Sequence, residues 1–122
     1  MTFYRSIPIV LTCLIAAPAV GQDFMSKQEL QATIPGATLF GISNQDKKTR
    51  WVQTYSKGKR RGTIAGLWGK DEYASKWQIK GNSWCEEWDG GSGCWKLVLI
   101  DDKTIHPYRD GKTYTGAIWN IR

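Results

Sequence analysis

The residues best suited to catalysis in this 122-residue chain do not form a recognisable catalytic set. His106 is the only histidine, so a serine–histidine–aspartate triad would depend on it alone. It precedes Pro107 in a strand-like stretch, and no serine occupies a Gly-x-Ser-x-Gly elbow. We interpret His106 as an ordinary strand histidine and expect no catalytic residues, that is, a protein that is not an enzyme.

The acidic residues that could share a proton are the adjacent pairs Glu86–Glu87 and Asp101–Asp102. Neighbours on a strand point to opposite faces, which disfavours the paired carboxylates of a glycosidase. We predict that both pairs are solvated turn and edge charges. Residues 89–93 lack the alternating carboxylates of a calcium loop, and one histidine leaves no zinc set. We therefore expect neither a metal nor a cofactor.

Cys85 and Cys94 flank an Asp-Gly pair at residues 89–90, which suits the centre of a two-residue type I′ turn. In that register Trp84 faces Trp95, and the two cysteines face each other at a non-hydrogen-bonded pair, where side chains come closest. The spacing predicts a Cys85–Cys94 disulfide. The same register places five apolar side chains on one face: Trp84, Trp88, Trp95, Leu97 and Leu99.

The amino terminus has the pattern of a signal peptide. Arg5 precedes an apolar run over residues 7–20, and Ala19 and Gly21 provide the small residues read at a cleavage site before Gln22. The run is shorter than the about 20 residues of a membrane span, so we expect no transmembrane anchor. We predict a signal peptide at residues 1–21, one disulfide-closed domain at 22–122, and periplasmic or secreted residence.

The mature chain is predicted to be mostly β. A capping box at Ser26 and Glu29 indicates a short helix over residues 26–34, stopped by Pro35. Segments rich in β-branched and aromatic residues then alternate with turn signals about every ten residues, which indicates an antiparallel up-and-down meander. We expect a lipocalin-like barrel of about eight strands, with an open sandwich as the alternative. The strands are expected at 38–43, 50–56, 61–67, 75–80, 82–88, 94–100, 104–109 and 113–119.

Several glycine, tryptophan and cysteine positions together resemble a family of small exported proteobacterial proteins classed only as a domain of unknown function. The resemblance covers most of the mature chain and implies periplasmic or secreted residence and a β-rich fold. It supplies no catalytic residues. The positions that carry it are the segments 36–41, 51–55, 77–79, 84–88, 94–95 and 110–111, with Gly58, Gly62 and Gly66.

Seven tryptophans are the strongest feature of the chain. The strand pattern assigns Trp77, Trp84 and Trp95 to the core, whereas Trp68 and Trp88 lie in or beside turns. Alternate turns of a meander lie at the same end, so those at 44–49, 67–74, 88–91 and 109–112 should share one mouth. Aromatic rings beside cations suit stacking on sugars or anionic ligands. The predicted ligand-binding residues are Trp68, Trp88, Tyr73, Lys47, Lys48 and Arg109.

The formal net charge is +6, and removing Arg5 with the leader leaves +5. The basic run at residues 57–61 falls at the end opposite the predicted mouth, and this separation and the export signal argue against nucleic acid as a partner. We expect a monomeric, non-enzymatic binding module for a small ligand, with a carbohydrate or other anionic envelope component as the candidate. The alternative is a protein-interaction module, an inhibitor or accessory factor acting on another envelope protein.

Overall fold

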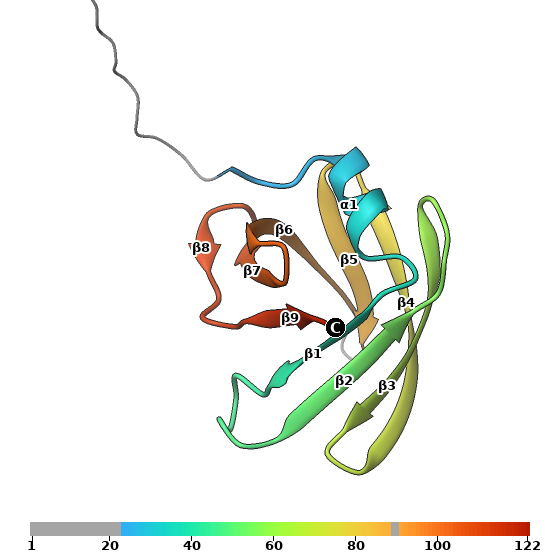
Figure 1. Ribbon diagram of the computed structural model, residues 1–122, viewed down its shortest axis with the longest axis vertical. Coiled ribbons are helices and arrows are strands. Elements are labelled where there is room, and N and C mark those ends of the chain that lie inside the picture. Colours follow the sequence, from blue (N-terminus) through green and yellow to red (C-terminus); the bar gives the residue numbers. More distant parts are fainter. Residues whose placement is uncertain (1–22, 89–90) are drawn as a thin grey trace, which may run out of the picture.

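Alternation of apolar and polar residues folds this chain into a closed antiparallel barrel (Figure 1). The computed structural model describes residues 23–88 and 91–122. The predicted leader at 1–21 and its cleavage site lie outside these residues. One helix, α1 (Lys27–Thr33), precedes strands β1 (Thr38–Ile42), β2 (Arg50–Tyr55), β3 (Arg61–Trp68), β4 (Asp71–Lys80), β5 (Ser83–Trp88), β6 (Gly91–Asp101), β7 (Thr104–Arg109), β8 (Thr113–Tyr114) and β9 (Trp119–Ile121).

The strands from β1 to β7 pair with their neighbours along the chain, and β9 closes the ring between β1 and β7. The predicted barrel of about eight strands is confirmed. The expectation of one strand over residues 113–119 is wrong. The chain there forms the two-residue β8 against β7, turns through Gly116 at φ +87°, and only then enters β9.

The β5–β6 hairpin has the predicted register. Trp84 lies opposite Trp95, and a disulfide joins Cys85 to Cys94 across a Cα–Cα distance of 4.0 Å. The expected turn residues, 89–90, lie outside the described part of the chain. Leu99 is an exception to the predicted apolar face, because its side chain is 39% exposed. A register shift between Leu99 and Asp101 breaks the strict alternation of the strand there.

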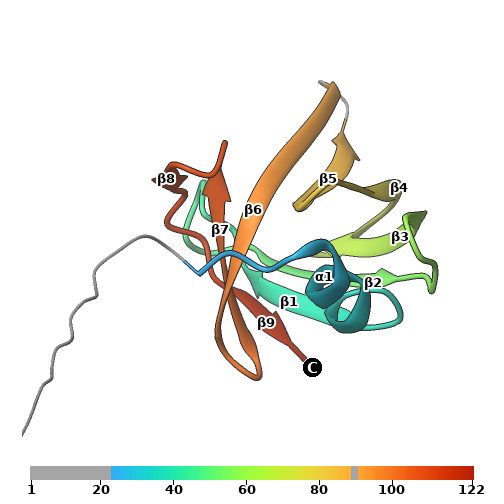
Figure 2. The same ribbon diagram turned by 90° about the horizontal axis from the view of Figure 1, so that it is seen from above.

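Helix α1 covers one end of the barrel (Figure 2). The Ser26 capping box is formed, and the side chains of Leu30 and Ile34 are fully buried. Two side-chain hydrogen bonds tie the helix to the turns at this end: the Lys27 amide donates to Asn82 Oδ1 at 2.9 Å, and Gln31 Nε2 donates to the Lys59 carbonyl at 2.7 Å. No helix within residues 23–88 and 91–122 is long and apolar enough to cross a membrane.

The barrel interior below α1 is a packed aromatic core. The indoles of Trp77 and Trp84 stack with centroids 4.8 Å apart, and Tyr55 meets Trp84 edge-on at 5.5 Å. Gly62 makes this possible, since a Cβ atom there would come within 2.5 Å of Trp77 Nε1. The predicted core positions of Trp77 and Trp84 are confirmed, with 1% and 0% of these side chains exposed.

Candidate ligand-binding site

The end of the barrel away from α1 contains a cavity of about 1080 Å³. Five of the seven tryptophans of the chain line it, together with Tyr73 and several polar groups, among them Ser43, Gln53 and Glu86. Aromatic rings combined with polar groups that can fix the orientation of a ligand are typical of small-molecule sites. The five tryptophans are Trp51, Trp68, Trp88, Trp95 and Trp119.

Strand alternation positions these rings. Trp51 lies directly opposite Trp68 across the β2–β3 ladder, so both side chains stand on the same face of the sheet. The rings also contact one another: Tyr73 meets Trp88 edge-on at 5.5 Å, and Trp95 meets Trp119 in the same way at 5.5 Å. Gly66 leaves room for the Tyr73 ring, because a Cβ there would lie 2.3 Å from its Cζ.

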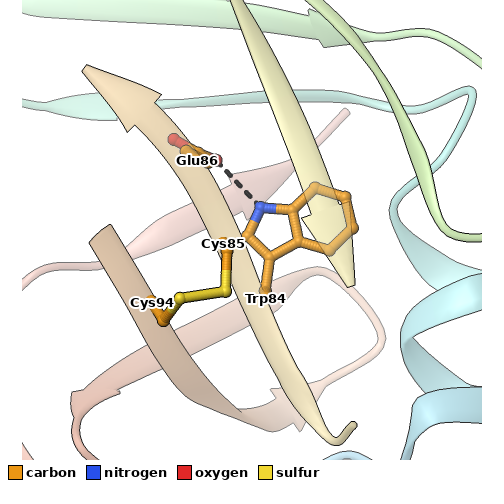
Figure 3. The surroundings of a disulfide bond; sticks show 4 residues. All are labelled: Trp84, Cys85, Glu86 and Cys94. Atoms are coloured by element: carbon orange, nitrogen blue, oxygen red, sulfur yellow. Dashed lines mark hydrogen bonds between the residues drawn. A yellow bond between two sulfur atoms is a disulfide. The ribbon is translucent and has the colours of Figure 1, made fainter. Parts of the chain in front are cut away.

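Glu86 lies inside this aromatic cavity and is only 4% exposed. Its Oε2 atom accepts two hydrogen bonds, from Trp84 Nε1 at 2.9 Å and from the Tyr55 hydroxyl at 3.0 Å. Figure 3 shows Trp84 donating to this carboxylate, whose second oxygen points away from the indole. Among the described residues, Glu86 is the only buried residue of a charged type.

Burial is the dominant influence on this carboxyl group and raises the pKa of Glu86 above its ordinary value of 4.5, although hydrogen bonds from Trp84 and Tyr55 act in the opposite direction. The network continues toward the opening. Gln53 Nε2 donates to the Tyr55 oxygen, and the half-buried Tyr73 hydroxyl donates to Gln53 Oε1 at 2.6 Å. Burial, with the nearby Glu86 charge, raises the pKa of Tyr73 to about 12, so this hydroxyl remains a donor at neutral pH.

The cavity extends to a gap between β4 and β5. The ladder between these strands covers only Trp77–Lys80 and Ser83–Glu86, whereas β4 begins at Asp71. Beyond the ladder, the Ser75 hydroxyl donates to the Glu87 carbonyl. Ser75, Lys76 and Glu87 are among the residues that line the cavity here. The regular pairing of β4 with β5 therefore ends beside the cavity, where the Ser75–Glu87 hydrogen bond still joins the two strands.

Three of the six predicted site residues come together in the structure. Trp68, Tyr73 and Trp88 all line the cavity. The cations do not. The Lys47 ammonium donates to Asn44 Oδ1 at 2.6 Å in the β1–β2 turn, and the exposed Lys48 follows it in the same turn. Arg109 is exposed at the end of β7, opposite Trp95.

Glu86 corrects the prediction that both glutamates of the 86–87 pair are solvated. Glu87 is exposed as predicted, but alternation turns Glu86 inward between Trp84 and Trp88. The hairpin register contained this signal, because any register that places both tryptophans inside places the residue between them inside too. Trp95 also differs from its predicted core role: it is half-buried and lines the cavity.

The remaining candidates for chemistry have structural positions. His106 lies on β7 as predicted, with its ring stacked on Tyr114 at a centroid distance of 4.7 Å. Asp101 accepts from the Lys103 amide in the β6–β7 turn. In the part of the chain that the structure describes, no three histidine, cysteine or acidic side chains gather as metal ligands.

Comparisons with known proteins return no match: no family model, no curated protein and no solved structure resembles this chain significantly. The assignment of the candidate site therefore rests on the geometry of this molecule alone.

Proposed function

We propose that this protein is a non-enzymatic binding module that takes a small organic ligand into the aromatic cavity of its barrel. The observation that carries the proposal is a cavity of about 1080 Å³ whose lining combines five tryptophans with one buried carboxyl group. Sites for drug-sized ligands have volumes of about 300–1,000 Å³, so this cavity is large enough for a disaccharide or a molecule of similar size.

Ring-bearing ligands suit the lining better than anionic ones. Trp68 and Trp88 are partly exposed, at 38% and 39%, and their indoles can offer flat apolar surface to a sugar or another ring. An anionic group inside the cavity would instead meet Glu86, while Lys47, Lys48 and Arg109 lie outside the lining. We therefore propose a carbohydrate or another ring-bearing molecule as the ligand, and not an anionic component of the envelope.

We also propose that the protein acts after export, in the periplasm or outside the cell. The signal-peptide pattern at residues 1–21 and the Cys85–Cys94 disulfide support an oxidising compartment. Intact-mass analysis of the exported protein should give a chain that begins at Gln22 and lacks two hydrogens. Recovery of only the full-length chain, or of free Cys85 and Cys94 thiols, would contradict this.

Tryptophan fluorescence tests the binding function, because most of the indoles of this chain line the cavity. Titration with a panel of sugars and small ring compounds should change the emission saturably. Trp68→Ala and Trp88→Ala should each weaken binding by about 1–3 kcal/mol if stacking here resembles stacking of bases on aromatic side chains. Phe40→Ala, which removes an exposed ring from outside the cavity, is the matched control and should leave the affinity unchanged.

The contrary result would be affinity that survives both tryptophan variants, or no saturable response to any compound. Co-purification of a stoichiometric envelope protein in that case would favour the protein-interaction alternative.

A further inference from the structure

We propose that the cavity selects organic cations, meaning protonated amines or quaternary ammonium groups, by holding the positive charge between Glu86 and the surrounding aromatic rings. This inference rests on the proposed function, since it names the ligand class of the same cavity.

The charge of the lining supports a cation. The whole chain carries a formal net charge of +6, yet the charged residues that line the cavity are Lys76, Glu86 and Glu87. Lys76 and Glu87 are exposed at the gap between β4 and β5, where water screens them. Glu86 is the one buried among the aromatic rings, so the interior of this basic protein presents an acidic group.

The hydrogen-bond partners of Glu86 are all neutral. Trp84 and Tyr55 donate to Oε2, and Gln53 and Trp88 also interact with the carboxyl group. A carboxylate has about four acceptor positions, and burial without a positive partner is costly. Within residues 23–88 and 91–122, no lysine or arginine forms an ion pair with Glu86. A ligand cation would therefore supply the missing counter-charge.

The aromatic rings provide the second component of the site. A cation is attracted to the face of an indole within about 6 Å of the ring centroid, and tryptophan is the strongest of the aromatic side chains in this respect. Five indoles and Tyr73 line the same cavity as the carboxylate. Aromatic rings together with a buried carboxylate bind an alkylated ammonium group through both its charge and its apolar surface. A neutral ring would use the aromatic surface alone.

The experiment compares ligands that differ only in charge. Choline is tested against 3,3-dimethylbutan-1-ol, in which carbon replaces the ammonium nitrogen, and benzylamine against benzyl alcohol. Each is titrated into the exported protein, with its disulfide intact, and followed by tryptophan fluorescence and calorimetry. In at least one pair the cation should bind about tenfold more tightly than its neutral partner.

Matched variants assign the preference to one carboxylate. Glu86→Gln keeps the size of the side chain and should weaken cation binding by about thirtyfold or more while leaving the neutral partner unaffected. Glu87→Gln removes the same charge from the exposed neighbour and should change the affinity for the cation less than threefold. The preference for the cation is itself measured on the wild-type protein, so that measurement does not depend on how well Glu86→Gln folds.

The possible results distinguish failure of the cation preference from failure of the proposed ligand-binding function. If neutral rings or sugars bind and neither cation is preferred, the cavity is a binding site and the cation inference is wrong. A preference that persists in Glu86→Gln also overturns it. If no compound of any class binds, both the inference and the proposed function fail.

Discussion

Trp77 and Trp68 show how environment separates residues of one type. Trp77 lies on β4 with 1% of its side chain exposed, stacked on Trp84 in the half of the barrel that α1 covers. Trp68 ends β3 in the half that contains the cavity and is 38% exposed. Removal of the Trp77 indole would leave a cavity that its packed neighbours cannot fill, whereas Trp68 already borders solvent.

Truncation of Trp77 should therefore be far more costly than truncation of Trp68. Trp77→Ala should lower the free energy of unfolding by about 3–5 kcal/mol, the range for large aromatic residues in cores, and Trp68→Ala by well under half of that. Urea denaturation followed by circular dichroism measures both. Equal losses would show that the two halves of the barrel are equally packed, contrary to the structure.

Glu86 should give the protein a pH-dependent stability of unusual sign for a carboxyl group. Burial raises its pKa in the folded state above the value of 4.5 that it has when exposed, so the folded protein binds this proton more tightly than the unfolded chain. Stability from this group is greatest below pH 4.5 and falls as pH rises toward the folded pKa. Each pKa unit of the rise costs about 1.4 kcal/mol above both values.

Glu86→Gln should remove that pH-dependent loss, and Glu87→Gln should retain it. The measurement is the free energy of unfolding of the three proteins between pH 4 and pH 8. Tyr55 and Tyr73, which face Glu86, do not titrate in this window because the pKa of each is raised above 10. A wild-type profile parallel to that of Glu86→Gln would mean that Glu86 ionises without a burial cost.

The β5–β6 hairpin is the element that joins the two halves of the barrel. Its inward face carries Trp84 in the core and then Glu86 and Trp88 in the cavity, while the disulfide joins its outer positions. One disulfide-joined strand pair therefore holds the carboxyl group and two of the cavity tryptophans in a common register.

Loss of the disulfide should destabilise this hairpin measurably. For a loop of about ten residues, the chain-entropy description gives about 2.5–3 kcal/mol. The double variant Cys85→Ser with Cys94→Ser should therefore melt about 10–20 °C lower than the oxidised protein. Calorimetry of the oxidised, reduced and doubly substituted proteins tests this, with the last two expected to agree. An unchanged melting temperature would mean that the pairing of β5 with β6 needs no crosslink.

The whole molecule has two chemically different ends. The basic run at residues 57–61 lies beside α1, where Gln31 bonds the Lys59 carbonyl, and the cavity lies at the other end of the strands. Strand β3 connects them, from Arg61 to Trp68, which corresponds to about 23 Å at 3.3 Å per residue. This exceeds the Debye length of about 10 Å at 0.1 M salt, so the two ends should act independently.

Neutralising the basic end should separate adsorption from cavity binding. The variant Lys59→Gln, Arg60→Gln, Arg61→Gln should elute from an anionic polymer column at lower salt but keep its cavity affinity within twofold. Lys47→Gln with Lys48→Gln is the control at the cavity end and removes two positive charges where the first variant removes three. If the 59–61 variant lost cavity affinity, the ligand would be bound at the basic turn and not in the barrel.

Local chemistry in the sequence determined the parts of this protein that depend on near neighbours. Ser26 and Glu29 specify the helix start within four residues, and the spacing of Cys85 and Cys94 predicted the observed β5–β6 register within ten. Most strand positions follow from alternation and turn residues, with the segment 113–119 as an exception, and the same pattern predicted that Trp68, Tyr73 and Trp88 lie together. The same alternation could have placed Glu86 inside.

Only the tertiary structure decided how these pieces close and what the cavity contains. Ring closure pairs Leu39 with Ile121, and burial of Glu86 needs Tyr55, which is 31 residues away in the chain. A carboxyl group next to turn residues is exposed unless distant strands supply hydrogen-bond donors and aromatic rings around it. The local sequence does not show which distant strands will lie there. The pKa of Glu86 and the acidic interior of a basic protein are therefore properties of the closed barrel.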